Sequence, residues 1–418
     1  MNIVTQDGRP RTVITGIGAI TPLGGVDEFW GNVKNGISGV KKLDHLDLSS
    51  INIHIAAFVD DFDPLLYMNR KTARRLPKCS QFALAATDLM LKDAGLTEDE
   101  LAELSERTGV VVGTGLAGFE SFDDGMCAWR AGKNIKPFAL PAGLANAPAH
   151  YISLRTKAVG PIIPVVAACA SGTHALVEAM HLIRSGRAER VFVGGVESTM
   201  KEYTLAGFDA MTGLARGYND MPEKASRPFD KNRNGFVFGE GAAIFTMETL
   251  ELALARDAHI YAEVVGGGIS SDAFHLVMLD PEGGGAVRSM KWALQDAKLD
   301  TSAINYINAH GTSTKANDKV ETLAIKKLFG HRAYDVPVSS TKSLIGHCMG
   351  AAGAIEAVAC IKTLEDQVLH PTINYETPDE DCDLDYVPNV ARDSKVQYAL
   401  SSNFGLGGQN ASVVLSRI

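Results

Sequence analysis

A single cysteine stands at a predicted junction between a buried strand and a buried helix. In the stretch 165–176, VVAACASGTHAL, a run of β-branched and small residues ends at Cys169, and apolar residues then recur at helical spacing towards a stop at Gly186. Backbone N–H groups at a helix N-terminus favour a thiolate and can stabilise an oxyanion on a substrate carbonyl. Free cysteines are also common as small core residues. This stretch alone leaves a nucleophile and a packing residue equally open.

Two histidines and a lysine follow other predicted strands. His310 lies in the hydroxyl-rich turn NAHGTST, and the segment SSTKSLIGH contains Lys342 and His347. Open α/β sheets bind ligands at the loops that follow their strands. One histidine in such a loop is more often structural, but three such turns with a thiol and two imidazoles favour a shared thiol–imidazole site. The loop NFGLGG (403–408) could supply another backbone N–H or close over a pocket.

Alternating strand and helix patterns must position these turns. The first part of the chain is expected to contain a helix at 81–94 and strands at 12–18, 108–113, 190–195 and 242–247. The second part is expected to contain helices at 286–297, 319–327 and 349–363 and strands at 262–266, 304–309, 336–339, 398–403 and 411–416.

The division between these two sets falls near residues 255–260 and predicts two α/β halves, 1–258 and 259–418. The stretch 339–356 repeats the order of strand, polar turn and small-residue helix found around the cysteine, which indicates an internal duplication. The proline-containing stretch 116–158 is too irregular for a simple crossover and is expected to form an inserted cap or interface region.

Composition limits what the chain can bind and where it works. The 418 residues carry a net charge of −9, which disfavours a general nucleic-acid surface. The six cysteines show no CxxC pair and no zinc-like spacing, so we expect reduced thiols and no metal. No apolar run reaches membrane-spanning length and no secretory leader is evident, so we expect a cytoplasmic protein with no membrane partner.

One dense basic cluster interrupts this acidic chain. The stretch 68–80, MNRKTARRLPKCS, places charges three and four residues apart, and that spacing brings several to one side of a helix. A solvated helix face is the ordinary interpretation, and a docking patch for an acidic partner is the sharper hypothesis. The cluster consists of Arg70, Lys71, Arg74, Arg75 and Lys78.

Four separated motifs, by their residues and by their order along the chain, resemble those of the elongating branch of the β-ketoacyl-[acyl-carrier-protein] synthases. They are ACASGTHAL, NAHGTST, SSTKSLIGH followed by GAAGAIE, and NFGLGG. The resemblance covers essentially the whole chain and implies a thiolase-like αβαβα layered sandwich of two similar halves, each with a five-stranded mixed sheet. It also implies an acyltransferase of fatty-acid elongation that works as a homodimer. Its substrates would reach it on the 4′-phosphopantetheine of an acyl carrier protein acting in trans, with no further cofactor.

The resemblance assigns roles to individual residues. Cys169 would carry the acyl group as a thioester, while His310 and His347 would hold the malonyl thioester carbonyl as CO2 leaves. The backbone amides of Cys169 and Phe404 would form the oxyanion hole, and Phe404 would also act as a gate. The supporting roles would fall to Lys342 and Glu356 behind the histidines, Thr312 and Thr314 on the pantetheine arm, Leu116 at the end of the acyl pocket, and Arg70, Lys71 and Arg74 in carrier docking.

Some positions depart from the family pattern. Lys315 and Asn317 replace the usual proline and glycine after HGTST, and Leu406 replaces a phenylalanine in the gating loop. These departures leave the chain-length preference open. The alternative activity is that of a ketosynthase subunit in a dissociated polyketide or polyene pathway, which would keep every catalytic residue. A non-catalytic partner subunit is disfavoured because the Cys–His–His set is intact.

Overall fold

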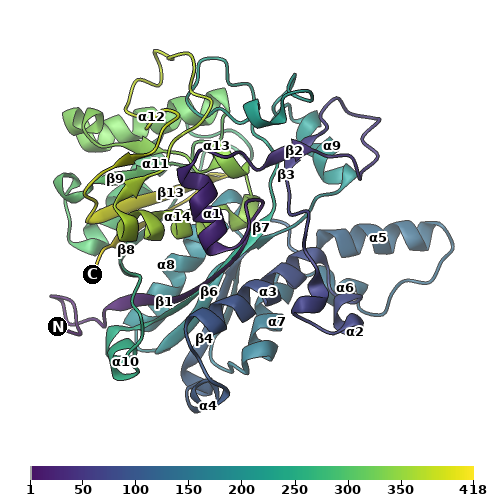
Figure 1. Cartoon of the computed structure of the whole chain (residues 1–418), viewed down its shortest axis with the longest axis horizontal. Coiled ribbons are helices and arrows are strands. Elements are labelled where there is room, and N and C mark those ends of the chain that lie inside the picture. The colour runs from purple at the N-terminus through teal and green to yellow at the C-terminus, as the bar shows by residue number, and fades with distance from the viewer. Residues whose placement is uncertain (1) are drawn as a thin grey trace.

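The computed structural model describes residues 2–418, and its main sheet contains ten strands (Figure 1). From the centre outwards, the first half contributes β1 (Thr12–Ile20), β7 (Gly241–Thr249), β6 (Arg190–Glu197), β4 (Thr108–Gly113) and β5 (Ile162–Val165). From the centre towards the opposite edge, the second half contributes β8 (Ala262–Ser271), β14 (Gln409–Ser416), β13 (Tyr398–Gly405), β9 (Tyr306–Asn308) and β10 (Val338–Ser339).

The two halves repeat one pattern of strand pairing. In the first, β1–β7 and β7–β6 are antiparallel, and β6–β4 and β4–β5 are parallel. In the second, β8–β14 and β14–β13 are antiparallel, and β13–β9 and β9–β10 are parallel. The expected fold of two similar five-stranded halves is confirmed. The two sets are also joined, because β1 and β8 pair at Val13–Glu263 and Ile14–Ala262.

Helices form three layers around these strands. Helices α8 (Ser171–Arg184) and α14 (Ala352–Asp366) lie in the middle and contact strands of both halves. On the outer faces, α3 (Lys78–Asp93) and α7 (Ala147–Thr156) cover the first half, and α11 (Gly284–Ala297) covers the second, with α12 (Lys315–Phe329) packed on α11. A Cβ on Gly18 would lie 2.0 Å from the carbonyl oxygen of Ala86, so glycine there lets α3 pack directly on β1.

The remaining elements lie around these layers. Between β4 and β5, α5 (Phe119–Arg130) and α6 (Ala139–Gly143) precede α7, and α5 extends away from the body of the molecule (Figure 1). No helix within residues 2–418 is long and apolar enough to cross a membrane. The other elements are α1 (Val26–Lys34), β2 (Val40–Lys42), β3 (Ile55–Ala57), α2 (Arg70–Ala73), α4 (Glu98–Glu103), α9 (Glu202–Ala210), α10 (Leu250–Ala255), α13 (Lys342–Ile345), β11 (Val368–Leu369) and β12 (Arg392–Asp393).

Two elements differ from the sequence expectation for identifiable reasons. The helix expected at 319–327 begins four residues earlier, because the Thr314 side chain caps it by accepting the N–H of Asn317. The basic cluster does not lie along one helix. Pro77 cannot continue a helix, so the four-residue α2 ends before it and α3 starts at Lys78.

Candidate active site

Cys169 lies on a tight turn between β5 and α8. The chain passes through Ala168 at φ +48°, a left-handed conformation that few non-glycine residues adopt. The Ser171 hydroxyl braces this turn: it accepts the N–H of Ala167 at 2.9 Å and lies 2.7 Å from the carbonyl oxygen of Ala168. The turn therefore holds the sulfur at the start of a buried helix.

The second half contains a matching turn in front of α14. Met349 adopts φ +46° at the start of a short 3-10 turn that leads into α14, as Ala168 does before α8. The two helix starts are in direct contact, because a Cβ on Gly172 would lie 2.7 Å from the backbone nitrogen of Ala354. The duplicated turns thus bring Cys169 and the loop of His347 together.

Burial dominates the acidity of the thiol. Cys169 is 8% exposed, and burial raises the pKa of its thiol to about 11. The charge of Lys342 and the backbone N–H groups of Leu406 and Cys169 lower this pKa, but by less than burial raises it. The thiolate that the helix N-terminus was expected to favour is therefore not the resting form of this site.

The two imidazoles are held as neutral hydrogen-bond donors. His347 Nδ1 accepts the N–H of Met349 at 3.2 Å, so its proton is on Nε2, which is buried and has no hydrogen-bond partner in residues 2–418. Asn403 Oδ1 accepts the Thr173 hydroxyl, so its Nδ2 donates to His310 Nδ1 at 3.2 Å and leaves the His310 proton on Nε2. Burial, reinforced by Lys342, holds the pKa of both imidazoles well below the ordinary value.

An ion pair lies behind the histidines. Lys342 and Glu356 are 1% and 0% exposed and form a salt bridge with each other. Glu356 also accepts Asn403 Nδ2 at 2.8 Å, so a continuous chain of contacts runs from Lys342 to His310. Burial raises the pKa of Glu356, and Lys342 opposes that rise by favouring the carboxylate.

Cys169, His310 and His347 line one cavity of about 530 Å³. The ring centroids of His310 and His347 are 5.3 Å apart at 85°, and the Phe404 ring lies 5.6 Å from that of His310. The remaining wall is mostly apolar. Its polar lining is Cys169, His310, Thr312, Thr314, Asn317, Lys319 and His347, and its apolar lining includes Phe208, Phe236, Met278 and Phe404.

The sequence matches two family models, the β-ketoacyl synthase N-terminal domain over residues 10–253 and the C-terminal domain over residues 261–376. The chain belongs to the β-ketoacyl synthase family. It is 43% identical over 411 residues to 3-oxoacyl-[acyl-carrier-protein] synthase 2 of Coxiella burnetii, covering 98% of this chain and 99% of that protein.

Solved structures of this family have the same fold. A β-ketoacyl synthase from Burkholderia phymatum matches with a TM-score of 0.91 and 36% identity, over 98% of this chain and 99% of that one. A ketosynthase solved in complex with its type II polyketide acyl-carrier protein matches with a TM-score of 0.89 and 32% identity, over 98% of this chain and 100% of that one.

Not every residue expected at the synthase site lines this cavity. Leu116 is 41% exposed and lies outside it, with its backbone N–H directed at Glu197. Thr312 and Thr314 line the cavity and hydrogen-bond to each other at 2.9 Å. The backbone N–H of Leu406, in the glycine-rich loop, approaches the Cys169 sulfur. The oxyanion hole expected from the amides of Cys169 and Phe404 stays a prediction.

The sequence patterns did not predict the roles of three polar residues of the synthase site. Asn403 fixes the His310 tautomer, and Glu321 accepts the backbone N–H groups of His310 and Gly311 at 2.7 and 2.8 Å. Glu197 is buried and accepts backbone N–H groups from two loops. A charged residue at the end of an apolar strand, as in RVFVGGVE, is a signal that could have identified Glu197.

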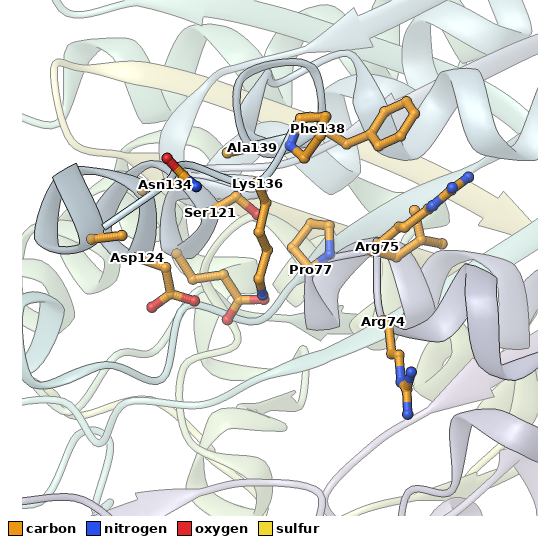
Figure 2. A pocket seen from close by; sticks show the side chains of 14 residues that line it. Arg74, Arg75, Pro77, Ser121, Asp124, Asn134, Lys136, Phe138 and Ala139 are labelled. Carbon is orange, nitrogen blue, oxygen red and sulfur yellow. The ribbon is translucent and has the colours of Figure 1, made fainter. Parts of the chain in front are cut away.

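The basic cluster lies beside a second pocket of about 360 Å³. Figure 2 shows Arg74 and Arg75 on one side of this pocket and Asn134 and Lys136 on the other. Arg75 stacks on Phe138, with its guanidinium carbon 4.8 Å from the ring centroid. Among the described residues, the exposed side chains with no ion-pair partner include Arg70, Lys71 and Arg74.

Proposed function

We propose that this synthase elongates acyl chains by decarboxylative condensation with malonyl-[acyl-carrier-protein]. The observation that carries the proposal is the convergence of one thiol and two neutral Nε2–H donors on a single cavity, made by Cys169, His310 and His347. A reactive thiol suits acyl transfer, and paired neutral donors suit a developing enolate. The similarity to 3-oxoacyl-[acyl-carrier-protein] synthase 2 supports fatty-acid elongation as the setting.

In the first step, the Cys169 sulfur attacks the thioester carbonyl of an acyl group carried on the acyl carrier protein. A new S–C bond forms at Cys169, the bond to the pantetheine sulfur breaks, and the thiol proton leaves with the released carrier thiol. One thioester replaces another, so little energy separates reactants and products. A thiol with a pKa of about 11 must lose its proton as the carbonyl approaches, and the amides of Leu406 and Cys169 and the charge of Lys342 favour that loss.

In the second step, His310 and His347 hold the thioester oxygen of the malonyl group. The bond to the carboxylate breaks, CO2 leaves, and its electron pair forms an enolate whose charge rests on that oxygen. Each preorganised donor to such an oxygen is worth about 10²–10³ in rate. The enolate carbon attacks the acyl carbonyl, and the Cys169 sulfur departs and takes up a proton. The product is a β-ketoacyl carrier two carbons longer.

We place the acidic carrier protein at Arg70, Lys71 and Arg74. These exposed cations are available for an incoming carboxylate surface, in contrast to Arg75, which stacks on Phe138. The ketosynthase solved with its acyl-carrier protein supports this class of partner.

We also propose a homodimer. Within residues 2–418, β5 lies at the edge of the sheet with one side unpaired, and apolar side chains are exposed on and near α5–α7. A second copy would cover both features. The exposed residues include Trp129, Leu140, Leu154 and Val159.

Intact-mass analysis tests the proposed reaction. Addition of carrier protein loaded with an acyl group is expected to transfer one acyl group to the wild-type enzyme. Malonyl-loaded carrier protein is then expected to remove that group and yield a β-ketoacyl carrier two carbons longer. Cys169→Ala should carry no acyl group. Cys348→Ala is the matched control, because Cys348 is buried beside His347 yet does not line the cavity. No adduct on the wild type, or an equal adduct on Cys169→Ala, contradicts the proposal.

A further inference from the structure

Glu197, the last residue of β6, is a buried carboxylate that joins loops from both halves of the chain. Its Oε2 accepts the N–H of Gly115 at 2.6 Å, of Leu116 at 3.2 Å and of Gly350 at 3.2 Å. The Thr114 hydroxyl lies 3.4 Å from its Oε1. Its partners in the described chain are amides and a hydroxyl, without a salt bridge to Lys, Arg or His.

Each of these loops leads to a catalytic group. Gly350 follows Met349, whose N–H sets the tautomer of His347. On the other side, the carbonyl oxygen of Thr114 accepts the Ser171 hydroxyl, which braces the turn that carries Cys169. The hydrogen bonds of the first path end on the imidazole of His347 itself, whereas those of the second path end on Ser171, two residues from Cys169.

The two loops are also packed against each other at this point. A Cβ on Gly350 would lie 2.2 Å from the backbone nitrogen of Gly115, and a Cβ on Gly115 would lie 2.7 Å from Glu197 Oε2. There is no room for a side chain at either glycine. The carboxylate therefore fixes one junction between the first half, which carries Cys169, and the turn that orients His347.

We propose that Glu197 is a positioning residue for the condensation: it holds the His347 turn against the Cys169 half, and so controls malonyl decarboxylation more strongly than acyl transfer. The inference rests on the proposed function, because it assigns decarboxylation to the histidine pair.

The charge of Glu197 adds a second, independent effect. Burial is the main cause of the raised pKa of three thiols, those of Cys79, Cys169 and Cys348, and the negative charge of Glu197 adds to each rise. Burial also raises the pKa of Glu197 itself to about 7, so this charge is fully present only above neutral pH. Removal of this charge should make the Cys169 thiol easier to ionise, while the weaker hydrogen bonds of a neutral acceptor to the three amides weaken decarboxylation. A general loss of structure would instead weaken malonyl decarboxylation and acyl transfer to Cys169 together.

Glu197→Gln in the full-length protein separates these outcomes. We expect malonyl-carrier-protein decarboxylation to fall about tenfold or more, which is about 1.4 kcal/mol. Transfer of an acyl group to Cys169 should stay within about threefold of the wild type, and the pH profile of Cys169 alkylation by iodoacetamide should move to lower pH. Glu240→Gln is the matched control, a buried carboxylate that contacts Lys78 and Ser198 and is expected to leave the alkylation profile unchanged.

Glu197→Asp is the second variant, since it keeps the charge but withdraws the carboxylate from the amides. It should retain the wild-type alkylation profile and still lose decarboxylation. The inference is overturned if decarboxylation by Glu197→Gln or Glu197→Asp stays within about threefold of the wild type, or if it falls equally with acyl transfer. Failure of the proposed function looks different, because the wild type itself would then form no acyl adduct.

Discussion

Loss of either partner of the buried Lys342–Glu356 ion pair is expected to destabilise the protein strongly. Lys342→Met leaves the Glu356 carboxylate buried with Asn403 as its remaining hydrogen-bond donor, and Glu356→Gln leaves a buried ammonium without its counter-charge. The double variant leaves neither charge. A comparison of the three therefore measures the coupling between the two groups.

The size of the effect follows from the burial of the pair. Two unit charges about 3 Å apart attract by roughly 5 kcal/mol at an effective dielectric constant of about 20. Desolvation of each ion opposes this attraction by several kcal/mol, so removal of one partner costs about 3–5 kcal/mol, whereas removal of both costs much less than the sum. At about 2.1 cal/mol/K per residue, 418 residues give an unfolding entropy of roughly 0.9 kcal/mol/K, and each single variant loses roughly 3–6 °C in Tm.

Thermal and urea unfolding at neutral pH measure the stability of the wild type, the two single variants and the double variant. Lys362→Met is the matched control on α14, because Lys362 pairs with Glu365 three residues away in a partly exposed position. That variant should lose no more than about 1 kcal/mol. If the double variant is destabilised by the full sum of the singles, or Lys342→Met by no more than the control, then Lys342 and Glu356 are not a coupled buried charge pair.

Three other predictions concern the reaction. Alkylation of Cys169 should accelerate about tenfold per pH unit from pH 7 to 10, because its thiol pKa is about 11, and a plateau near pH 8.5 measured by peptide mapping would contradict this. His347→Leu should slow malonyl-carrier decarboxylation by about 10²–10³ and spare acyl transfer, since it removes one oxyanion donor; equal losses in both assays would refute that role. Charge reversal at Arg70, Lys71 and Arg74 should raise KM for carrier-bound substrates at low salt with kcat retained, and Arg75→Glu is the control; an unchanged KM removes the docking assignment.

Sequence patterns predicted the elements that carry the site because the signals there are local. Cys169, His310 and His347 each stand just beyond an apolar run, and apolar periodicity marks strands and helices well. The predicted helix boundaries were less accurate where a capping side chain or a proline ring decides where the helix begins or ends. Thr314 extends α12 towards the site by capping it, and Pro77 divides the basic cluster between two helices.

Residues that act across the two halves were not predicted. Asn403 accepts the hydroxyl of Thr173 from the first half, and Glu197 accepts the N–H of Gly350 from the second half. These contacts form only when the two halves pack together, and no spacing in the sequence indicates them. The duplication was visible as a repeated order of elements. Its consequence, the contact of Gly172 with the start of α14, depends on how the halves pack.

The acidity of Cys169 shows how tertiary structure can reverse a correct local argument. A helix N-terminus stabilises a negative charge by about 0.3–1 kcal/mol, which is less than one pKa unit. Burial outweighs this effect and the charge of Lys342, so the thiol pKa rises to about 11. The thiol and the two imidazoles that would meet the thioester are then all neutral, with the Lys342–Glu356 ion pair held behind them. Charge develops there only when a thioester arrives, and the donors that would stabilise it are already in place.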